Sequence, residues 1–102
     1  MTDDSTTWAS GDWQVTEGDV DEFVARWRAF LEWTKADNAG FGHARLLRDL
    51  NRPGHFVSFS AWRDPAAMKD WQSRPEFAEH VGACRALCED MTSSGYELAV
   101  AV

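Results

Sequence analysis

One stretch of this sequence decides the fold of the chain: Phe56-Val57-Ser58-Phe59-Ser60-Ala61-Trp62. Its aromatic and β-branched residues are typical of a β-strand, in which successive side chains point to opposite faces of the sheet. One face would carry Phe56, Ser58, Ser60 and Trp62, and the other Val57, Phe59 and Ala61. Neither set contains the charged residues of a solvent-exposed face, so the sequence predicts a strand that is covered on both sides.

Turn residues precede this strand and helix signals follow it. Asn51-Arg52-Pro53-Gly54 has strong turn chemistry and links it to a strand expected over residues 43–50, so the two form a hairpin. Downstream, Asp64 and Pro65 suit the N-cap and the first position of a short helix that ends at Arg74.

A second helix is expected to begin at Pro75. Its apolar positions recur at helical spacing, with His80 at the edge of the stripe: Phe77, Val81, Cys84, Leu87, Cys88 and Met91. Ser93-Ser94-Gly95 would break this helix, and residues 96–102 would form a terminal strand.

The N-terminal part supplies one more strand and one more helix. Residues 8–16 alternate like a half-buried strand, in which we interpret Gly11 as a bulge. Asp19 then caps a helix that ends near residues 38–40 and whose apolar residues recur at helical spacing. Residues 1–6 are small, polar and acidic, and are expected to form a disordered tail before a domain of residues 7–102.

The elements therefore follow in the order strand, helix, strand, strand, two helices, strand. This order predicts an α+β protein with the ferredoxin-like split βαβ arrangement, a four-stranded antiparallel sheet with helices on one face. Because the aromatic strand has two apolar sides, the other face of the sheet also needs a cover. A two-fold homodimer in which two sheets pack together supplies that cover.

Composition restricts the class of protein. A chain of 102 residues with 44% hydrophobic residues has the material for one domain with a core. It lacks the roughly 18 consecutive apolar residues of a membrane helix, and its N-terminus is acidic, so we expect a soluble, cytoplasmic protein with no membrane contact. Its net charge of −7 leaves no basic face for nucleic acid.

The two cysteines do not indicate a metal site. Cys84 and Cys88 lack the further Cys or His ligands that such sites bring together. We interpret both as small buried hydrophobic residues on one helix.

The 6 tryptophans and 6 phenylalanines exceed the needs of a small core, so some rings are expected to face a small, flat aromatic ligand. Trp62 and Ser58 share one side of their strand and can line such a pocket together, or Trp62 can simply pack the sheet onto the helices. His80 can exchange a proton near neutral pH or bind iron, or it can be a satisfied core residue. His55, in the turn, is interpreted as solvated.

The strand that ends at Trp62, the helix start at Asp64-Pro65 and the segment Trp71-Gln72-Ser73-Arg74-Pro75-Glu76-Phe77 together resemble the antibiotic-biosynthesis monooxygenase family. The resemblance extends from about Trp8 to Val102. It implies a homodimeric α+β barrel with a pocket between each sheet and its helices. Characterised members oxidise polycyclic aromatic compounds or degrade haem.

The resemblance to the cofactor-free members implies roles for single positions. Those enzymes oxidise aromatic polyketides to quinones and have a tryptophan that looks like Trp62, with an asparagine four residues earlier, at Ser58 in this chain. Their tyrosine on the short helix falls near Met68, and their helical arginine falls near Val81. Of these groups, this sequence keeps only the tryptophan.

The resemblance to the haem-degrading members implies a different set. Their tryptophan on the short helix matches Trp71, and their histidine ligand lies within one position of His80. Their asparagine on the first strand falls near Gly11. This sequence therefore has a tryptophan and a nearby histidine of the three groups, but not the asparagine.

Our first hypothesis is an oxygenase that acts without metal or flavin on a polycyclic aromatic or phenolic, polyketide-like substrate. Its pocket would be shaped by Phe23, Trp27, Trp62, Met68 and Trp71. Ser58 would donate a hydrogen bond to a substrate oxygen and His80 would accept the phenolic proton. The alternatives are haem binding or degradation with His80 as iron ligand, closure of a polyketide ring without oxygen, and a non-catalytic ligand-binding dimer.

Overall fold

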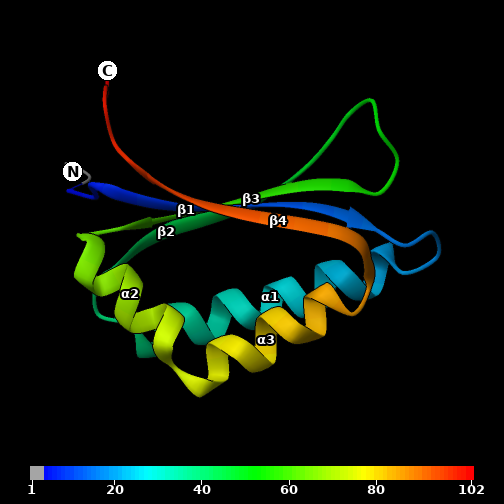
Figure 1. The fold of residues 1–102 in the computed structure, drawn as a ribbon, viewed down its shortest axis with the longest axis horizontal. Coiled ribbons are helices and arrows are strands. Elements are labelled where there is room, and N and C mark those ends of the chain that lie inside the picture. The colour runs from blue at the N-terminus through cyan, green and yellow to red at the C-terminus, as the bar shows by residue number, and fades with distance from the viewer. Residues whose placement is uncertain (1–3) are drawn as a thin grey trace.

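Within residues 4–102, the part of the chain that the computed structural model describes, four strands form one sheet and three helices pack on one of its faces (Figure 1). The elements are β1 (Thr7–Val15), α1 (Val20–Asp37), β2 (Phe41–Arg48), β3 (His55–Trp62), α2 (Pro65–Ser73), α3 (Pro75–Arg85) and β4 (Cys88–Glu97). The strand order is β2-β3-β1-β4, and every neighbouring pair is antiparallel. The predicted α+β, ferredoxin-like fold is confirmed.

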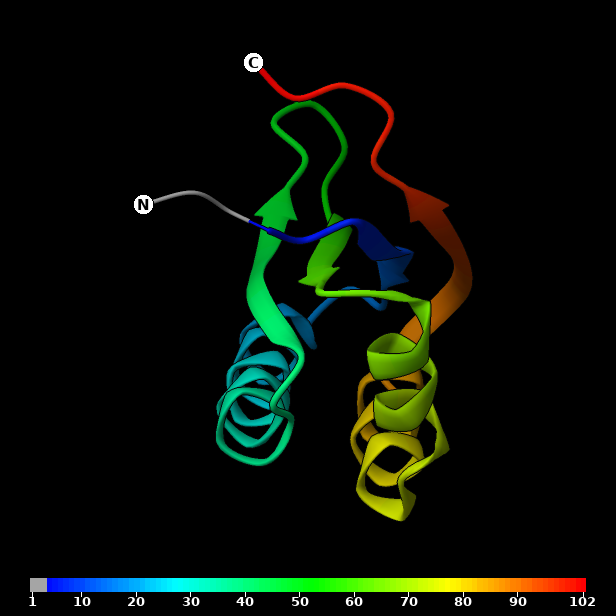
Figure 2. The same ribbon diagram turned by 90° about the vertical axis from the view of Figure 1, so that its left-hand side faces the viewer.

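The helices divide the covered face of the sheet between them. Figure 2 shows α1 below the β2 side of the sheet, and α2 and α3 below the β4 side. No helix among the described residues is both long enough and apolar enough to cross a membrane.

β3 is covered on its helix-facing side and stays partly exposed on the other side, where the sequence predicts a second cover. Phe56, Ser58, Ser60 and Trp62 face the helices and are buried. On the other side Ala61 is buried, whereas Phe59 is 37% exposed. Because β3 lies between β2 and β1, both of its edges are hydrogen-bonded.

α1 packs onto the sheet through a stripe of rings. Phe23, Trp27, Phe30 and Thr34 are its buried residues, at the spacing of an amphipathic helix. Asp19 stands at the N-cap, but its side chain accepts no capping hydrogen bond, and only its backbone carbonyl accepts the N–H of Phe23 over 2.9 Å. The expected Asp19 side-chain cap is therefore wrong, whereas the expected end of the helix near residue 38 is confirmed.

The start of α2 follows the prediction. The Asp64 carboxylate accepts the backbone N–H of Ala67 over 2.8 Å, and Pro65 occupies the first turn. This hydrogen bond, followed by the one from Arg63, lowers the pKa of Asp64. The cap and the proline together define where the chain leaves β3 for the helical layer.

The C-terminal elements differ from the prediction. α3 ends at Arg85, and Ser93, Ser94 and Gly95 lie inside β4 rather than in a break between a helix and a strand over residues 96–102. They pair with Gly11, Ser10 and Ala9 of β1. A full ladder of backbone hydrogen bonds to β1 outweighs the weak strand preference of small polar residues.

Two further local expectations also need correction. The register shift of β1 against β4 lies between Gln14 and Val15, so Gly11 is not a bulge. In the expected tail, residues 1–3 lie outside the described part. Ser5 is buried, and the N–H of Thr6 donates to the carbonyl of Trp62 over 3.0 Å, which attaches this end of the segment to β3.

The cysteines are separated by the end of α3. Cys84 is buried in the helix and Cys88 begins β4, where its thiol donates to the carbonyl of Cys84 over 3.4 Å. Burial raises the pKa of Cys84 to about 12 and that of Cys88 to about 11. Both thiols therefore stay protonated at neutral pH and behave as small hydrophobic groups, although only Cys84 is helical.

The face of the sheet away from the helices, which we call the outer face, has large apolar side chains at its surface. Leu47 is 51% exposed, Phe59 37% and Tyr96 55%. Trp8 lies on the same face, with its ring 5.1 Å from that of His43 in an edge-on contact. The segment 98–102 projects beyond this face and carries further exposed apolar side chains (Figures 1 and 2).

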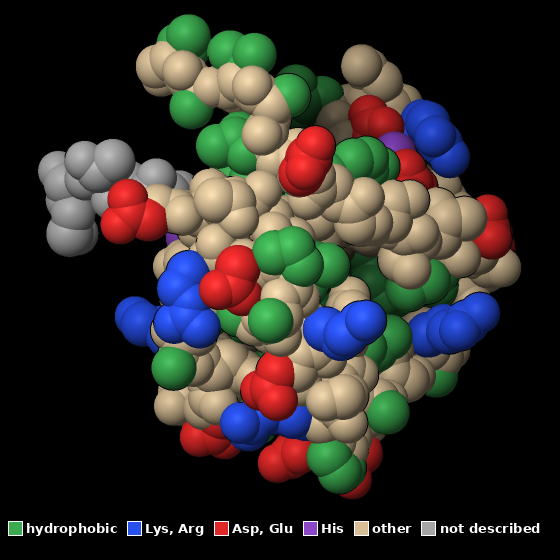
Figure 3. All heavy atoms as spheres, turned by 60° about the vertical axis from the view of Figure 1, so that its left-hand side comes forward, with side chains coloured by type: hydrophobic (Ala, Val, Ile, Leu, Met, Phe, Trp, Pro, Cys, Tyr) green, Lys and Arg blue, Asp and Glu red, His purple; other side chains and the backbone are tan. Residues whose placement is uncertain are grey.

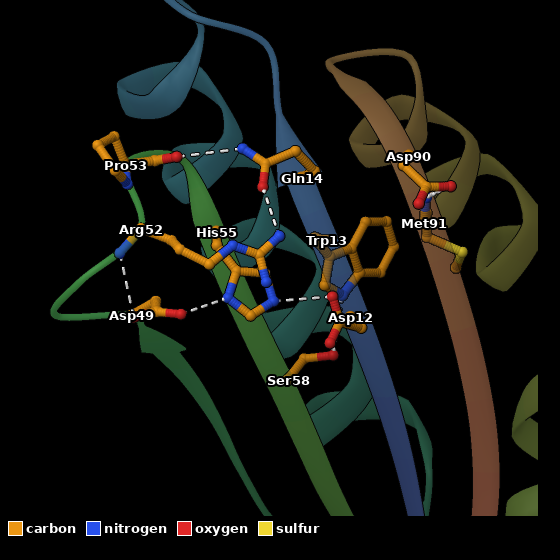
Figure 4. Close-up of polar contacts among 10 residues, drawn as sticks. All are labelled: Asp12, Trp13, Gln14, Asp49, Arg52, Pro53, His55, Ser58, Asp90 and Met91. Atoms are coloured by element: carbon orange, nitrogen blue, oxygen red, sulfur yellow. Dashed lines mark hydrogen bonds and ion pairs between the residues drawn. The ribbon is translucent and has the colours of Figure 1, made fainter.

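His55 joins the turn between β2 and β3 to β1 (Figure 4). Its Nδ1 lies 2.7 Å from Oδ2 of Asp49 and its Nε2 lies 2.8 Å from Oδ1 of Asp12. Carboxylates only accept hydrogen bonds, so both contacts are satisfied when both ring nitrogens carry a proton, which favours the charged imidazole. The expectation that His55 is solvated is wrong, because its strand partner is Gln14 and Asp12 lies two residues away on the same face.

These contacts shift two pKa values in opposite directions. The hydrogen bonds to Asp49 and then to Asp12 raise the pKa of His55 above 6.5. The backbone N–H of Asn51 and then the His55 ring lower the pKa of Asp49 below 3.8. Between pH 3.8 and pH 6.5, His55 is therefore protonated while Asp49 is ionised, and the ion pair between them is fully formed.

We expect His55→Gln to destabilise the protein most between pH 3.8 and pH 6.5. The contribution of His55 is full below the pKa of the unfolded chain and is lost as pH rises through its raised folded value. The contribution of Asp49 is lost as pH falls through its lowered folded value. Urea unfolding midpoints of the wild type and the variant across this range and above it measure the effect.

Glu89→Gln, at an exposed position, is the control for the loss of one ionisable group. A destabilisation by His55→Gln that stayed constant with pH would contradict the charged pairing.

Candidate functional site

A cavity of about 600 Å³ lies between the sheet and the helices, and we call it the sheet–helix cavity. α1 contributes Trp27, Phe30 and Leu31 to its wall, and α2 and α3 contribute Met68, Trp71, Phe77 and Val81. β1, β3 and β4 form its floor. Figure 3 shows hydrophobic side chains recessed in a hollow of this face, with Lys or Arg side chains beside it.

The cavity exists because the middle of the sheet carries small side chains toward the helices. Ala9 pairs with Ser60 and Gly95, and Gly11 pairs with Ser58 and Ser93. Residues opposite one another in a ladder share a face, so these positions form one patch of small side chains on the sheet. Large rings flank the patch, with Trp13 and Phe56 at one end and Trp62 at the other. The helices rest on these rings and leave the middle open.

Two serine hydroxyls on the cavity floor are oriented by tryptophans. The indole N–H of Trp13 donates to Oγ of Ser58 over 3.1 Å, and that of Trp62 donates to Oγ of Ser60 over 2.9 Å. Each serine oxygen thus accepts one hydrogen bond from the protein and keeps its own O–H proton free to donate. The floor therefore offers hydrogen-bond donors to an oxygen atom of a ligand.

The wall is fixed by contacts between helices. Trp71 of α2 stacks on Phe30 of α1 with ring centroids 5.6 Å apart, and its indole N–H donates to Oγ1 of Thr34 over 3.1 Å. Phe77 of α3 makes an edge-to-face contact with Trp71, with ring centroids 4.7 Å apart. These rings give the cavity rigid, flat walls that suit an aromatic ligand.

Arg85 is the only ionisable side chain among the described residues that line this cavity. It comes from the C-terminal end of α3. Gln72 adds a neutral amide. The cavity thus presents one cation and several neutral donors, which favours a ligand that carries or develops negative charge on oxygen.

The structure brings four of the predicted site residues together: Ser58, Trp27, Met68 and Trp71 all line the cavity. Trp62 and Phe23 do not, because both are fully buried behind its wall. Trp62 lies under Trp71 with ring centroids 4.6 Å apart, and Phe23 packs against Trp13 and Phe56. These two rings support the lining rather than form it.

His80 also lies away from the cavity lining. Its ring stacks on Phe30 at 5.4 Å and on Trp33 at 5.5 Å, so it belongs to the contact between α3 and α1. Phe77 and Val81 point inward from the same helix, and a residue between them turns toward α1 because each helical position rotates by about 100°. The expected convergence of Trp62, Trp71 and His80 on one cavity is therefore wrong.

The haem alternative relied on His80 as the iron ligand. No histidine is among the described residues that line the sheet–helix cavity, so the residues present do not fit an imidazole-ligated haem there. No group of three or more His, Cys, Asp or Glu residues within 4–102 is placed to hold a metal ion.

Sequence reasoning missed Ser60, Gln72 and Arg85. Ser60 had a signal, because it alternates with Ser58 on one side of β3. Arg85 also had one, since it follows Val81 by four residues on the inward side of α3. Gln72 had no signal of its own, because its place in the cavity depends on how α2 packs against the sheet.

We expect Gly11→Ala to lower the free energy of unfolding by about 1–3 kcal/mol. A Cβ at this position would lie 2.5 Å from Nε1 of Trp13 and 2.8 Å from Oγ of Ser58, and both side chains are buried. The Trp13–Ser58 hydrogen bond would have to break or the strand would have to shift. Chemical unfolding followed by circular dichroism measures the loss.

Gly82→Ala is the matched control, because a Cβ there meets nothing within 4 Å and lies in α3. It should gain about 0.5–1 kcal/mol from helix propensity. Equal stability of Gly11→Ala and the wild type would show that the floor is not packed as described.

Comparison with known proteins identifies one family. The family model described as antibiotic biosynthesis monooxygenase matches residues 9–83. SnoaB from Streptomyces nogalater, a cofactor-independent oxygenase, is 24% identical over 96% of this chain and 95% of its own, with a TM-score of 0.76. No curated protein matches this chain.

Two further solved structures share the fold. A candidate antibiotic biosynthesis monooxygenase from Deinococcus radiodurans is 20% identical over 94% of this chain and 95% of its own, with a TM-score of 0.83. Another from Caulobacter crescentus is 13% identical over 94% and 92%, with a TM-score of 0.84. At these identities, the structural likeness shows the fold alone.

Proposed function

The chain belongs to the antibiotic biosynthesis monooxygenase family, and we propose that it is a cofactor-independent oxygenase of a phenolic, polycyclic aromatic substrate. The observation that carries this proposal is the chemistry of the sheet–helix cavity. Its walls are aromatic rings, its floor offers the Ser58 and Ser60 hydroxyls, and its one ionisable lining residue is Arg85. A volume of about 600 Å³ is in the range of pockets for small organic ligands.

In this proposal the substrate lies along the aromatic wall that Trp27, Phe30 and Trp71 form, with its oxygen toward the floor. The free O–H protons of Ser58 and Ser60 donate to that oxygen, and Arg85 adds positive charge from the α3 side. All three stabilise the oxygen more strongly as its negative charge grows, which is the condition for an effect on rate. Met68 completes the apolar wall.

The reaction balances without an external reductant. A ring CH₂ loses two hydrogens and gains one oxygen atom from O₂, while the second oxygen atom leaves with those hydrogens as water. Both electron pairs come from the substrate, whose ionised phenol makes the ring carbon electron-rich. The protein binds and orients the substrate and stabilises the anion.

The group that accepts the phenolic proton differs from the one in our first hypothesis. His80 packs between Phe30 and Trp33, so we propose that the phenolic proton leaves to water rather than to His80. The Ser58 hydroxyl and Arg85 then act by lowering the pKa of the bound phenol.

We expect Ser58→Ala to lower kcat/KM for an anthrone-like substrate by about a hundredfold, since it removes one donor to the developing oxyanion. Oxygen uptake with an electrode measures this loss. Ser73→Ala, at the exposed end of α2, is the control and should leave oxygen uptake unchanged. Unchanged activity in Ser58→Ala would contradict its role, and turnover without oxygen uptake would indicate ring closure instead.

Oxygen uptake measured across pH distinguishes water from His80 as the acceptor of the phenolic proton. If the substrate ionises by itself, the midpoint of the pH profile follows the phenolic pKa as substrates are exchanged, and His80→Gln keeps the wild-type profile. A profile that stays fixed across substrates and is lost in His80→Gln would restore the histidine as the base.

We also propose that two copies of the chain pack through their outer faces. Members of the family are typically dimeric, and the exposed rings of Phe59 and Tyr96 lie on that face. The indole N–H of Trp8 is buried there without a hydrogen-bond partner among the described residues.

Phe59→Glu is expected to convert the dimer to a monomer, because it places a charge inside an apolar interface. Sedimentation velocity gives the mass, and Ala78→Glu, at an exposed position of α3, adds the same charge elsewhere. A wild type that sediments as a monomer at all concentrations would contradict the dimer.

A further inference from the structure

A second hollow lies on the opposite side of α1 from the sheet–helix cavity, and we call it the α1–β2 groove. Its volume is also about 600 Å³, and residues of α1 and of the edge strand β2 line it. Trp27 and Leu31 line both hollows, so the turn of α1 that carries them forms a shared wall.

The charge of this groove is opposite to that of the chain. Four cations line it, namely Arg28 and Lys35 of α1 and Arg45 and Arg48 of β2, against one acid, Glu32. The chain as a whole has a net charge of −7. Such a local excess of positive charge attracts and orients anions.

These cations are not used in ion pairs within residues 4–102. The arginine ion pairs of the described residues use Arg26, Arg63 and Arg74 instead. Arg48 is positioned by the ring of Phe56, whose centroid lies 5.1 Å from its guanidinium carbon, and Arg45 donates to the carbonyl of Ala44. Both guanidinium groups thus keep donors free for a carboxylate.

The interior of the groove is apolar. Val24, Leu31 and Leu46 line it, together with the rings of Trp27 and Phe56. These side chains offer an apolar surface to the body of a ligand.

We propose that the α1–β2 groove binds an organic acid, a small molecule with a flat apolar body and one carboxylate. The carboxylate contacts Arg48, which shares the helix-facing side of β2 with Leu46, and the apolar body lies on Val24, Leu31 and Leu46. This site is separate from the substrate site and does not depend on the oxygenase proposal. The two differ in charge, because four cations line the groove and one lines the sheet–helix cavity.

The test compares 2-naphthoate with 2-naphthol, which have the same ring system with and without a negative charge at neutral pH. Calorimetric titration of the wild type should show naphthoate binding with an affinity that falls as salt is added. Arg48→Gln should weaken naphthoate at least about tenfold and leave naphthol unchanged. Arg28→Gln/Lys35→Gln changes the other wall and should act in the same direction.

Two controls locate the site. Arg74→Gln removes one charge outside both hollows, and Arg85→Gln removes the cation of the sheet–helix cavity; both should keep the wild-type affinity for naphthoate. Circular dichroism and sedimentation of each variant should match the wild type.

Three results would overturn the proposal. One is no naphthoate binding by the wild type. Another is a loss of naphthoate binding in Arg85→Gln but not in the groove variants, which would place the anion in the sheet–helix cavity. The third is a change of oligomeric state in the groove variants, which would mean that a second copy of the chain occupies the groove along β2.

Discussion

The contrast between large and small side chains on the helix-facing side of the sheet governs the rest of this structure. Trp13, Phe56 and Trp62 stand at the two ends of this side, and Gly11 and Ser58 lie between them. Helices that rest on the large rings cannot also contact the small residues, since close packing is limited by the tallest side chains. A cavity in the middle of the layer follows directly from this pattern.

The same contrast determines the polarity of the cavity. Trp13 and Trp62 are too polar at the indole nitrogen to be buried without an acceptor, and Ser58 and Ser60 provide those acceptors. In return the serines are left with protons to donate. The hydrogen bonds that allow the two tryptophans to be buried also orient the serine hydroxyls toward the cavity. The same contacts therefore stabilise the fold and prepare the floor to bind an oxygen atom of a ligand.

α1 separates two environments of similar volume and different charge. On one side the lining is aromatic with a single arginine, and on the other an apolar interior is surrounded by four cations. Trp27 takes part in both linings. A ligand in one hollow therefore contacts a side chain that also faces the other, which gives the two sites a short physical connection.

Local patterns in the sequence determined the class of fold, since alternation in β3, the helical spacing of α1 and the Asp64–Pro65 start of α2 each depend on nearby residues. The family resemblance, together with the many aromatic rings, predicted that Ser58, Trp27, Met68 and Trp71 share one pocket. Tertiary structure alone decided the limits of β4, where pairing with β1 outweighed local preference, and the contact of His55 with Asp12, which is 43 residues away in sequence. It also decided which side of α3 His80 faces. Periodicity specifies which residues share a side of an element, whereas the direction of that side depends on how whole elements pack.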